Sequence, residues 1–209
     1  DTTASVNGLA IGVTAAGDVA KDRIAYRSGA KPNDLICLSG DLGAAYMGLH
    51  LLEREKRACG GQPDPKPKFE GHEYILGRQL KPEARTDIIE RLAEAGIVPT
   101  SMIDITDGLA SETLHLCKSS GCGARIYLDR LPIARQTHDM AEELHADPVV
   151  AALNGGQDYE LLFTVPLSKQ QEIFALGVDV IGHVTAAGTG AMLVTPDGSE
   201  IALKAPGWK

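Results

Sequence analysis

The chain has 209 residues, of which 44% are hydrophobic and only 4% aromatic, and its formal net charge is -8. This length is enough for one large domain or two small ones with a buried core. The 23 glycines and few aromatics favour α/β architecture, in which helices approach a sheet closely. Because the acidic chain has no Lys/Arg cluster, nucleic acids and anionic membrane surfaces are excluded as expected partners.

The cysteines and the hydropathy pattern indicate a cytoplasmic protein. Cys37, Cys59, Cys117 and Cys122 are scattered, without a C-x-x-C pair or the histidine spacing of a zinc site, so we expect free, mostly buried thiols. No apolar run reaches the roughly 20 residues that cross a bilayer, and no charged and apolar leader opens the chain. Because the sequence begins at Asp1, inside a motif, we expect an amino-terminal part to precede it.

The first half of the chain predicts two strand-turn-helix units, each with an apolar strand followed by an apolar-periodic helix. The N-cap of the first helix is expected at Asp41. In order, the elements are a strand at 9–15, a buried strand at 35–38, a helix at 42–57, a Pro/Gly-rich loop at 59–68, a helix at 85–94, an extended segment at 101–105 and a helix from Asp107 to Gly121.

The second half predicts short strands alternating with short helices, and Asp197-Gly198 is a strong hairpin signal. The expected elements are a strand at 124–128, helices at 135–144 and 148–153, a strand at 159–165, a helix at 167–176 and strands around 180–184, 191–194 and 200–203. The fold class is therefore α/β with a mixed sheet.

The segment MIDITDGLA, residues 102–110, carries two carboxylates where a strand turns into a helix. Asp104 and Asp107 are three residues apart, so both can lie on one side of the turn. Carboxylates are ligands that Mg²⁺ prefers, and a helix start offers backbone N–H groups to an anion. The alternative is that Asp107 only caps the helix and Asp104 makes a turn hydrogen bond.

The segment NGGQDYELLF, residues 154–163, contains two glycines that permit a sharp backbone reversal and let a ligand approach the main chain closely. In a strand, Asp158 and Glu160 project to one face, where one of them can serve a site, while Tyr159, Leu161 and Phe163 face the core. The alternative is a half-buried strand after a turn.

Two further segments offer charged groups. Asp1 stands beside two hydroxyls, a grouping that can ligate a metal but frays at a free terminus. The 27–32 loop offers Arg27 and Lys31 to phosphates, or is an ordinary surface turn. No histidine has a catalytic spacing, and His115 is expected to be structural or exposed.

Taken in order, DTT, RSGAKPND, GDLGAA, MIDITDGLA and GGQDYELLF resemble the thiamine-monophosphate kinase family along nearly the whole chain. The family's usual strings are close to GGDTT, RSGAKPGD, MIDISDGLA and GGEDYEL. The resemblance implies the aminoimidazole-ribonucleotide-synthetase-like fold, with two α/β domains and ATP and Mg²⁺ between them. On that layout, residues 1–20 end the amino-terminal domain, and residues 21–209 form the carboxy-terminal catalytic domain.

The resemblance also implies site residues, namely the metal ligands Asp1, Asp104 and Asp107, the ATP contacts Arg27 and Thr106, and the substrate contacts Gln157 and Trp208. Gln157 replaces the family's first glutamate in GGEDYEL, which removes a negative charge beside a cationic substrate. An amide still forms hydrogen bonds.

The activity implied is ATP-dependent phosphorylation of thiamine monophosphate to thiamine diphosphate with Mg²⁺. No general base is needed, because a phosphate monoester is already ionised near neutral pH. The family is a homodimer whose dimer-forming sheet lies mostly in the amino-terminal domain, so this segment alone is expected to be inactive. The alternatives are another ATP-using member of the fold, or a non-catalytic module that binds nucleotide or a partner.

Overall fold

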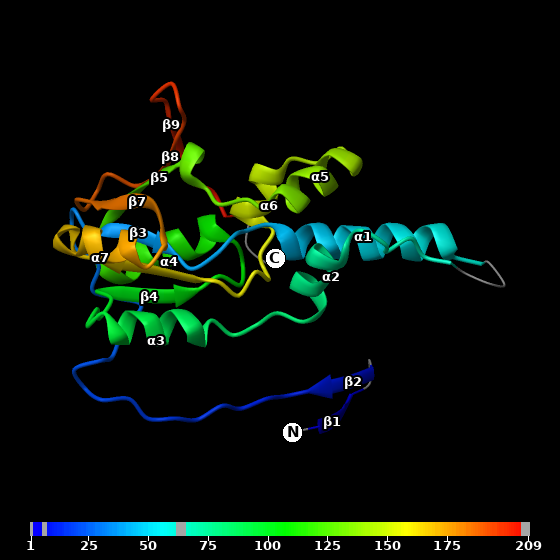
Figure 1. Ribbon diagram of the computed structural model, residues 1–209, viewed down its shortest axis with the longest axis horizontal. Helices are drawn as coiled ribbons and strands as arrows, with labels where there is room; N and C mark the ends of the chain where they lie inside the picture. Colours follow the sequence, from blue (N-terminus) through cyan, green and yellow to red (C-terminus); the bar gives the residue numbers. More distant parts are fainter. Residues whose placement is uncertain (1, 6–7, 62–65, 206–209) are drawn as a thin grey trace.

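The computed structural model describes residues 2–5, 8–61 and 66–205. Its strands are β1 (Thr2–Ser5), β2 (Gly8–Ile11), β3 (Leu35–Leu38), β4 (Ser101–Asp104), β5 (Gly123–Tyr127), β6 (Leu161–Val165), β7 (Asp179–Thr185), β8 (Ala191–Val194) and β9 (Glu200–Ala202). Seven of them form one mixed sheet in the order β4-β6-β3-β7-β5-β8-β9 (Figure 1). Only the β5–β8 pair is parallel.

The helices are α1 (Ala44–Cys59), α2 (Glu73–Leu80), α3 (Thr86–Glu94), α4 (Leu109–Ser120), α5 (Arg135–Glu143), α6 (Pro148–Asn154) and α7 (Gln170–Ala175), with 3₁₀ turns at Leu128–Arg130 and Leu167–Lys169. None of the helices in the described ranges combines the length and the apolar character needed to cross a bilayer.

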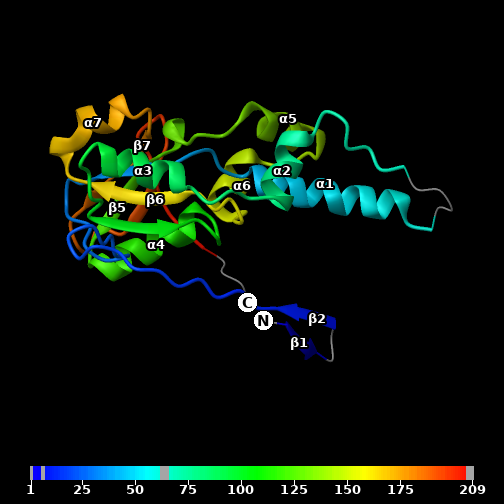
Figure 2. The same cartoon turned by 60° about the horizontal axis from the view of Figure 1, so that its bottom comes forward.

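Helices cover the sheet on two faces (Figure 2). On one face, α4 packs Leu109 and Leu116 into a cluster with Ile36 of β3 and Ile126 of β5. On the other face, α3 and α7 pack against β3 and β6, where Phe163 is fully buried. This packing holds together, at one end of the sheet, the carboxyl ends of β3 and β4 and the amino end of β6.

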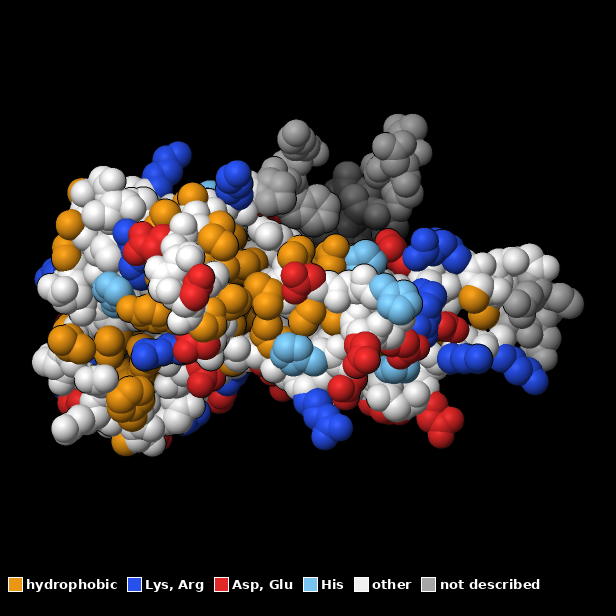
Figure 3. Space-filling view, turned by 90° about the horizontal axis from the view of Figure 1, so that it is seen from above, with side chains coloured by type: hydrophobic (Ala, Val, Ile, Leu, Met, Phe, Trp, Pro, Cys, Tyr) orange, Lys and Arg blue, Asp and Glu red, His pale blue; other side chains and the backbone are white. Residues whose placement is uncertain are grey.

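A lobe of helices extends beyond that end of the sheet. Helices α1, α2, α5 and α6 share a core that includes Met47, Leu51, Ile75 and Met140. Gly48 permits the contact between α1 and α2, because a Cβ there would lie 2.3 Å from the carbonyl oxygen of Ile75. Acidic and basic side chains are interspersed on the outer part of this lobe (Figure 3).

Most predicted elements are present, with shifted ends. The strands at 35–38 and 191–194 have the predicted bounds, α3 ends at Glu94 as predicted, and α4 ends at the predicted Gly121. The 167–176 helix is divided into a 3₁₀ turn and α7, and α2 and β1 were not predicted. Of the predicted 59–68 loop, residues 62–65 lie outside the described residues.

Two local predictions are wrong. Asp41 is not the N-cap of α1, since the helix starts after Gly43, whose φ of 84° turns the chain, and the Asp41 carboxylate instead accepts the Tyr74 hydroxyl at 2.5 Å. The strand predicted from Tyr159 begins at Leu161, because Gln157 and Tyr159 have left-handed φ values of 63° and 53°. Tyr159 is consequently 36% exposed and does not face the core.

The first strand predicted, at 9–15, is present as the shorter β2, which pairs with β1 in a separate two-stranded sheet. Residues 12–20 have no regular structure and lead from this hairpin to the main sheet. The hairpin is thus outside the sheet that contains β6. The domain boundary near residue 20 stays a prediction.

Candidate functional site

Three loops meet at one end of the sheet, which we call the site end. Asp104 at the end of β4 pairs with Leu161 at the start of β6, and Leu38 at the end of β3 pairs with Leu162. The 39–43 loop, the 104–107 turn and the 154–160 loop therefore emerge side by side. The two segments with the most informative sequence motifs are brought together here.

Backbone hydrogen bonds join the 104–107 turn to the 154–160 loop. The N–H of Ile105 donates to the carbonyl of Glu160 at 2.8 Å, and the N–H of Gln157 donates to that of Thr106 at 2.8 Å. Gly156, with φ of 71°, lies so close that a Cβ would be 2.3 Å from the Thr106 oxygen. The glycine thus permits close approach between two protein segments, whereas the sequence predicted close approach of a ligand.

Asp104 and Asp107 are both exposed in this turn. Within the described residues, neither carboxylate accepts a hydrogen bond or forms an ion pair. The alternative that Asp107 caps a helix is wrong, because α4 begins at Leu109 after Gly108 and has no side-chain cap. Two unpaired carboxylates three residues apart fit Mg²⁺, which binds one or two carboxylates together with substrate phosphates.

Glu112 of α4 fixes the other side of this turn. Its buried carboxylate accepts the backbone N–H of Asp107 at 3.1 Å and the Thr106 hydroxyl at 3.3 Å. These bonds compensate for its burial and hold the turn against the start of α4. Sequence reasoning missed Glu112, although an acidic residue in the first turn of a helix is a recognised signal.

Gln157 lies in the loop beneath this turn. Its Oε1 accepts the Tyr159 hydroxyl at 2.9 Å, and the residue is partly exposed. The side chain therefore contacts an aromatic hydroxyl rather than the backbone of the Gly155-Gly156 turn.

The predicted ATP contact Arg27 is exposed and lies beside β4, where the carbonyl of Tyr26 accepts the N–H of Met102 at 2.8 Å. The chain then leads away from Asp104, since Gly29 lies against Thr100 at the other end of the strand. The structure brings Asp104, Thr106, Asp107 and Gln157 together, but places Arg27 beside the strand. Asp1 and Trp208 lie outside the described residues.

Asp158 and Glu160 follow Gln157, and each is 1% exposed. The backbone N–H of Gly43 donates to both oxygens of Asp158, at 3.1 and 3.0 Å, so this distant carboxylate caps α1. Burial raises the pKa of Asp158 to about 7, against the opposing effect of the bound Gly43 N–H.

Glu160 joins the site end to the segment between α2 and α3. One oxygen lies 2.8 Å from Nη1 of Arg78, while the other accepts Arg85 and the Ser39 hydroxyl. Arg85 also forms a paired contact with Asp87, at 2.9 Å for both bonds. The two arginines pair with the buried carboxylate, and Arg85 fixes the linker against the sheet.

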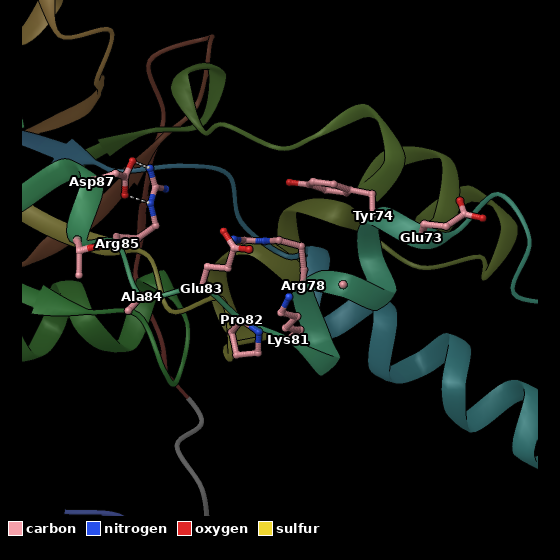
Figure 4. Close-up of a pocket in the computed structure, with 11 residues that line it drawn as sticks. Glu73, Tyr74, Arg78, Lys81, Pro82, Glu83, Ala84, Arg85 and Asp87 are labelled. Carbon is pink, nitrogen blue, oxygen red and sulfur yellow. Dashed lines mark hydrogen bonds and ion pairs between the residues drawn. The ribbon is translucent and has the colours of Figure 1, made fainter. Parts of the chain in front are cut away.

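A pocket of about 620 Å³ opens beside this network. Tyr74 and Arg78 extend across it from α2, and Lys81, Glu83 and Arg85 line it from the linker (Figure 4). Its charges are mixed, so it can receive a ligand that carries both signs. Sequence reasoning missed this pocket because α2 was not predicted.

Within the described part of the chain, no group of three or more His, Cys, Asp or Glu side chains forms a ready metal site. A cation at Asp104 and Asp107 therefore needs ligands from elsewhere, such as phosphate oxygens.

Comparison with known proteins gives a consistent result. Residues 31–195 match the family model described as AIR synthase related protein, C-terminal domain. The chain is 35% identical over 218 residues to the thiamine-monophosphate kinase of Escherichia coli (strain K12), covering 100% of this chain and 60% of that protein. It is 32% identical to that of Aquifex aeolicus (strain VF5), covering 90% and 55%. It thus spans somewhat more than half the length of these relatives.

Similar solved structures include thiamine-monophosphate kinases. The structure of AaThiL complexed with AMPPCP and TMP has a TM-score of 0.68 at 31% identity, covering 86% of this chain and 52% of that one. Thiamine-monophosphate kinase from Stenotrophomonas maltophilia K279a gives 0.71 at 26% identity, covering 88% and 56%. The hydrogenase maturation protein HypE of E. coli, at 19% identity and 0.62, shares the fold.

Proposed function

The chain belongs to the AIR synthase related protein family, matched through its C-terminal domain, and we propose that it works in ATP-dependent phosphorylation of thiamine monophosphate to thiamine diphosphate. The observation that carries the proposal is the exposed, unpaired pair Asp104 and Asp107, held by the 154–160 loop in the motif typical of thiamine-monophosphate kinases. Support comes from relatives with that name and from a similar structure that holds an ATP analogue and TMP.

The reaction brings two anions together, so their repulsion is the main obstacle. A bound Mg²⁺ supplies neutralisation of the phosphate charges. In the proposal, Asp104 and Asp107 hold it, with Asp1 as a further ligand. The acceptor phosphate is already ionised near neutral pH. The three loops of the site end contain no histidine, in accord with a reaction that needs no general base.

The remaining assignments complete the proposal. Arg27 and Thr106 contact ATP, while Gln157 and Trp208 contact thiamine monophosphate. The bound nucleotide faces the 104–107 turn, and Glu112 keeps that turn in place. The protein acts as a homodimer in the cytoplasm.

The test is Asp104→Asn in the full-length protein, assayed for thiamine diphosphate formation across a magnesium titration. The amide is nearly isosteric but a poorer magnesium ligand, so we expect turnover to fall about 100-fold, which equals about 2.7 kcal/mol of activation free energy, and the magnesium requirement to rise. Stability should change by less than about 0.5 kcal/mol, because the side chain is exposed and unpaired.

The matched control is Asp139→Asn, which removes an exposed carboxylate of α5 outside the three loops of the site end and should leave turnover unchanged. Equal rates for Asp104→Asn and the unmodified protein at every magnesium concentration would overturn the metal role. A protein that makes no thiamine diphosphate in unmodified form would overturn the activity itself.

A further inference from the structure

Two cysteines meet where α4 ends and β5 begins. Gly121 turns the chain with φ of 64°, and the N–H of Cys122 donates to the carbonyl of Cys117 at 3.1 Å. In this type of helix ending, the side chain after the glycine packs on a side chain of the last turn. Here both are cysteines, and Cys122 packs against the same apolar cluster to which Cys117 belongs.

The two thiols differ in access to solvent. Cys117 is 7% exposed and belongs to the core beneath α4, whereas Cys122 is half-buried and packs against that core from its edge. A small solute can therefore reach Cys122 first. Cys59 ends α1 on the opposite side of the molecule, and Cys37 is fully buried in β3.

We propose that Cys117 and Cys122 are a thiol-oxidation site, which forms an intramolecular disulfide by exchange with a low-molecular-weight disulfide such as oxidised glutathione. The Cys122 thiol loses its proton to solvent, and the thiolate attacks a glutathione sulfur, which breaks that S–S bond and releases one reduced glutathione. Cys117 then loses its proton and attacks the Cys122 sulfur, which releases the second. Two protein thiols are oxidised and one glutathione disulfide is reduced.

The surroundings make this a slow site. Burial raises the pKa of Cys117 to about 12 and raises that of Cys122, so little thiolate is present at neutral pH. Exchange requires the thiolate. The pair accordingly stays reduced during brief exposure and is oxidised under sustained oxidising conditions.

The position of the pair links it to the 27–32 loop. Between the two cysteines, the Ser120 hydroxyl oxygen accepts the N–H groups of Gly29 and Ala30, both at 3.2 Å. A disulfide would fix the turn that carries Ser120. The site end lies at the opposite end of α4, whereas Arg27, the proposed ATP contact, belongs to the loop that Ser120 holds.

The experiment treats the folded, full-length protein with oxidised glutathione at about pH 8.5, near the ordinary pKa of a cysteine. The concentration of oxidised glutathione is raised until half of the Cys59 side chains carry glutathione. Cys59 then serves as an internal measure of how strongly the protein has been oxidised. Free thiols are then alkylated, and trypsin cleaves after Lys118 and Arg125, between and after the two cysteines. The sample is compared with Cys122→Ser and Cys59→Ser variants by mass spectrometry.

In the protein without substitutions and in Cys59→Ser, we expect the peptide ending at Lys118 to be disulfide-linked to residues 119–125 of the same chain. The link should disappear with dithiothreitol. Cys122→Ser should give no such link. The proposal is overturned if both thiols are alkylated, if Cys122 retains glutathione while Cys117 is alkylated, or if the link joins two chains. These results do not depend on kinase activity.

Discussion

Four of the carboxylates at the site end of the sheet form two pairs with opposite surroundings. Asp104 and Asp107 are exposed and have no partner within the described residues, whereas Asp158 and Glu160 are 1% exposed and fully bonded. The exposed pair is available to a cation, and the buried pair holds α1 and the α2–α3 linker in place. The comparison separates the carboxylates that are open to a ligand from those that hold the surrounding segments together.

The backbone explains this division. The 154–160 loop lies against the 104–107 turn, so its alternate side chains point into the protein beneath that turn, while Asp104 and Asp107 remain on the outside. A buried carboxylate needs both a charge partner and hydrogen bonds. Glu160 has two arginines, and Asp158 has the N–H groups at the start of α1.

The largest effect on stability is expected at Glu160. Glu160→Gln removes the buried charge between Arg78 and Arg85, which leaves partly buried Arg78 without its ion pair and Arg85 with Asp87 alone. The free energy of unfolding should therefore fall by about 3–5 kcal/mol. The matched control is Glu200→Gln, which breaks an ion pair with Arg125 in which the carboxylate is 42% exposed. That variant should lose less than about 1 kcal/mol. Urea denaturation measures both, and equal losses would contradict the division into pairs.

The contact between the two pairs can be broken at Gly156. Gly156→Ala combines a left-handed φ with a Cβ 2.3 Å from the Thr106 oxygen, so about 2–4 kcal/mol of stability should be lost and the 104–107 turn displaced. Gly188→Ala is the control, because its φ is 82° but the space is open. It should lose about 1–2 kcal/mol. Thermal unfolding compares them, and identical losses would argue against the close contact.

Asp158 gives the buried pair a distinctive pH dependence. Its pKa is raised from 3.8 to about 7 on folding, so the native state binds the proton more tightly than the unfolded chain. Its contribution to the free energy of unfolding is therefore fully present below pH 3.8, the pKa of the unfolded chain, and is lost as pH rises to about 7.

Asp158→Asn removes the titration while keeping an acceptor for Gly43. Relative to the unmodified protein, the stability of the variant should rise by up to about 4 kcal/mol as pH increases from about 4 to about 7. Denaturant titrations at several pH values measure this difference. A constant difference would show that Asp158 does not titrate in that window.

The sequence predicted the exposed pair but not the buried network. Asp104 and Asp107 stand in one short motif at a strand-to-helix turn, so local spacing was sufficient. The contact of Glu160 with Arg78 and Arg85 joins segments that are 82 and 75 positions apart and has no local signature. Its partner helix α2 is short, and its contact with α1 depends on Gly48.

The alternating pattern of the 159–165 segment failed for a physical reason. It correctly placed Leu161 to Val165 in a strand, but it predicted extended backbone from Tyr159, two residues before the strand begins. The left-handed conformations of Gln157 and Tyr159 rotate the tyrosine outward and leave both Asp158 and Glu160 buried. Such backbone conformations are rare outside glycine and are fixed here by hydrogen bonds to the neighbouring turn.

The smallest expected effect concerns Gln157, which lies between the two pairs and replaces a glutamate of the related family pattern. Gln157→Glu keeps an oxygen that can accept the Tyr159 hydroxyl and adds a negative charge beside the cationic thiamine of the proposed substrate. A pair of unit charges about 4 Å apart is worth roughly 1–4 kcal/mol between watery and partly shielded surroundings.

The lower value corresponds to about fivefold in affinity. In the full-length protein, Gln157→Glu should therefore lower the KM for thiamine monophosphate about fivefold and leave the KM for ATP nearly unchanged. Gln136 is an exposed residue of α5 outside the three loops of the site end, so Gln136→Glu adds the same charge there and should change neither constant. A shift in the KM for ATP, or in neither constant, would place Gln157 outside the thiamine end of the site, because an added charge there cannot leave the binding of a cation unaltered.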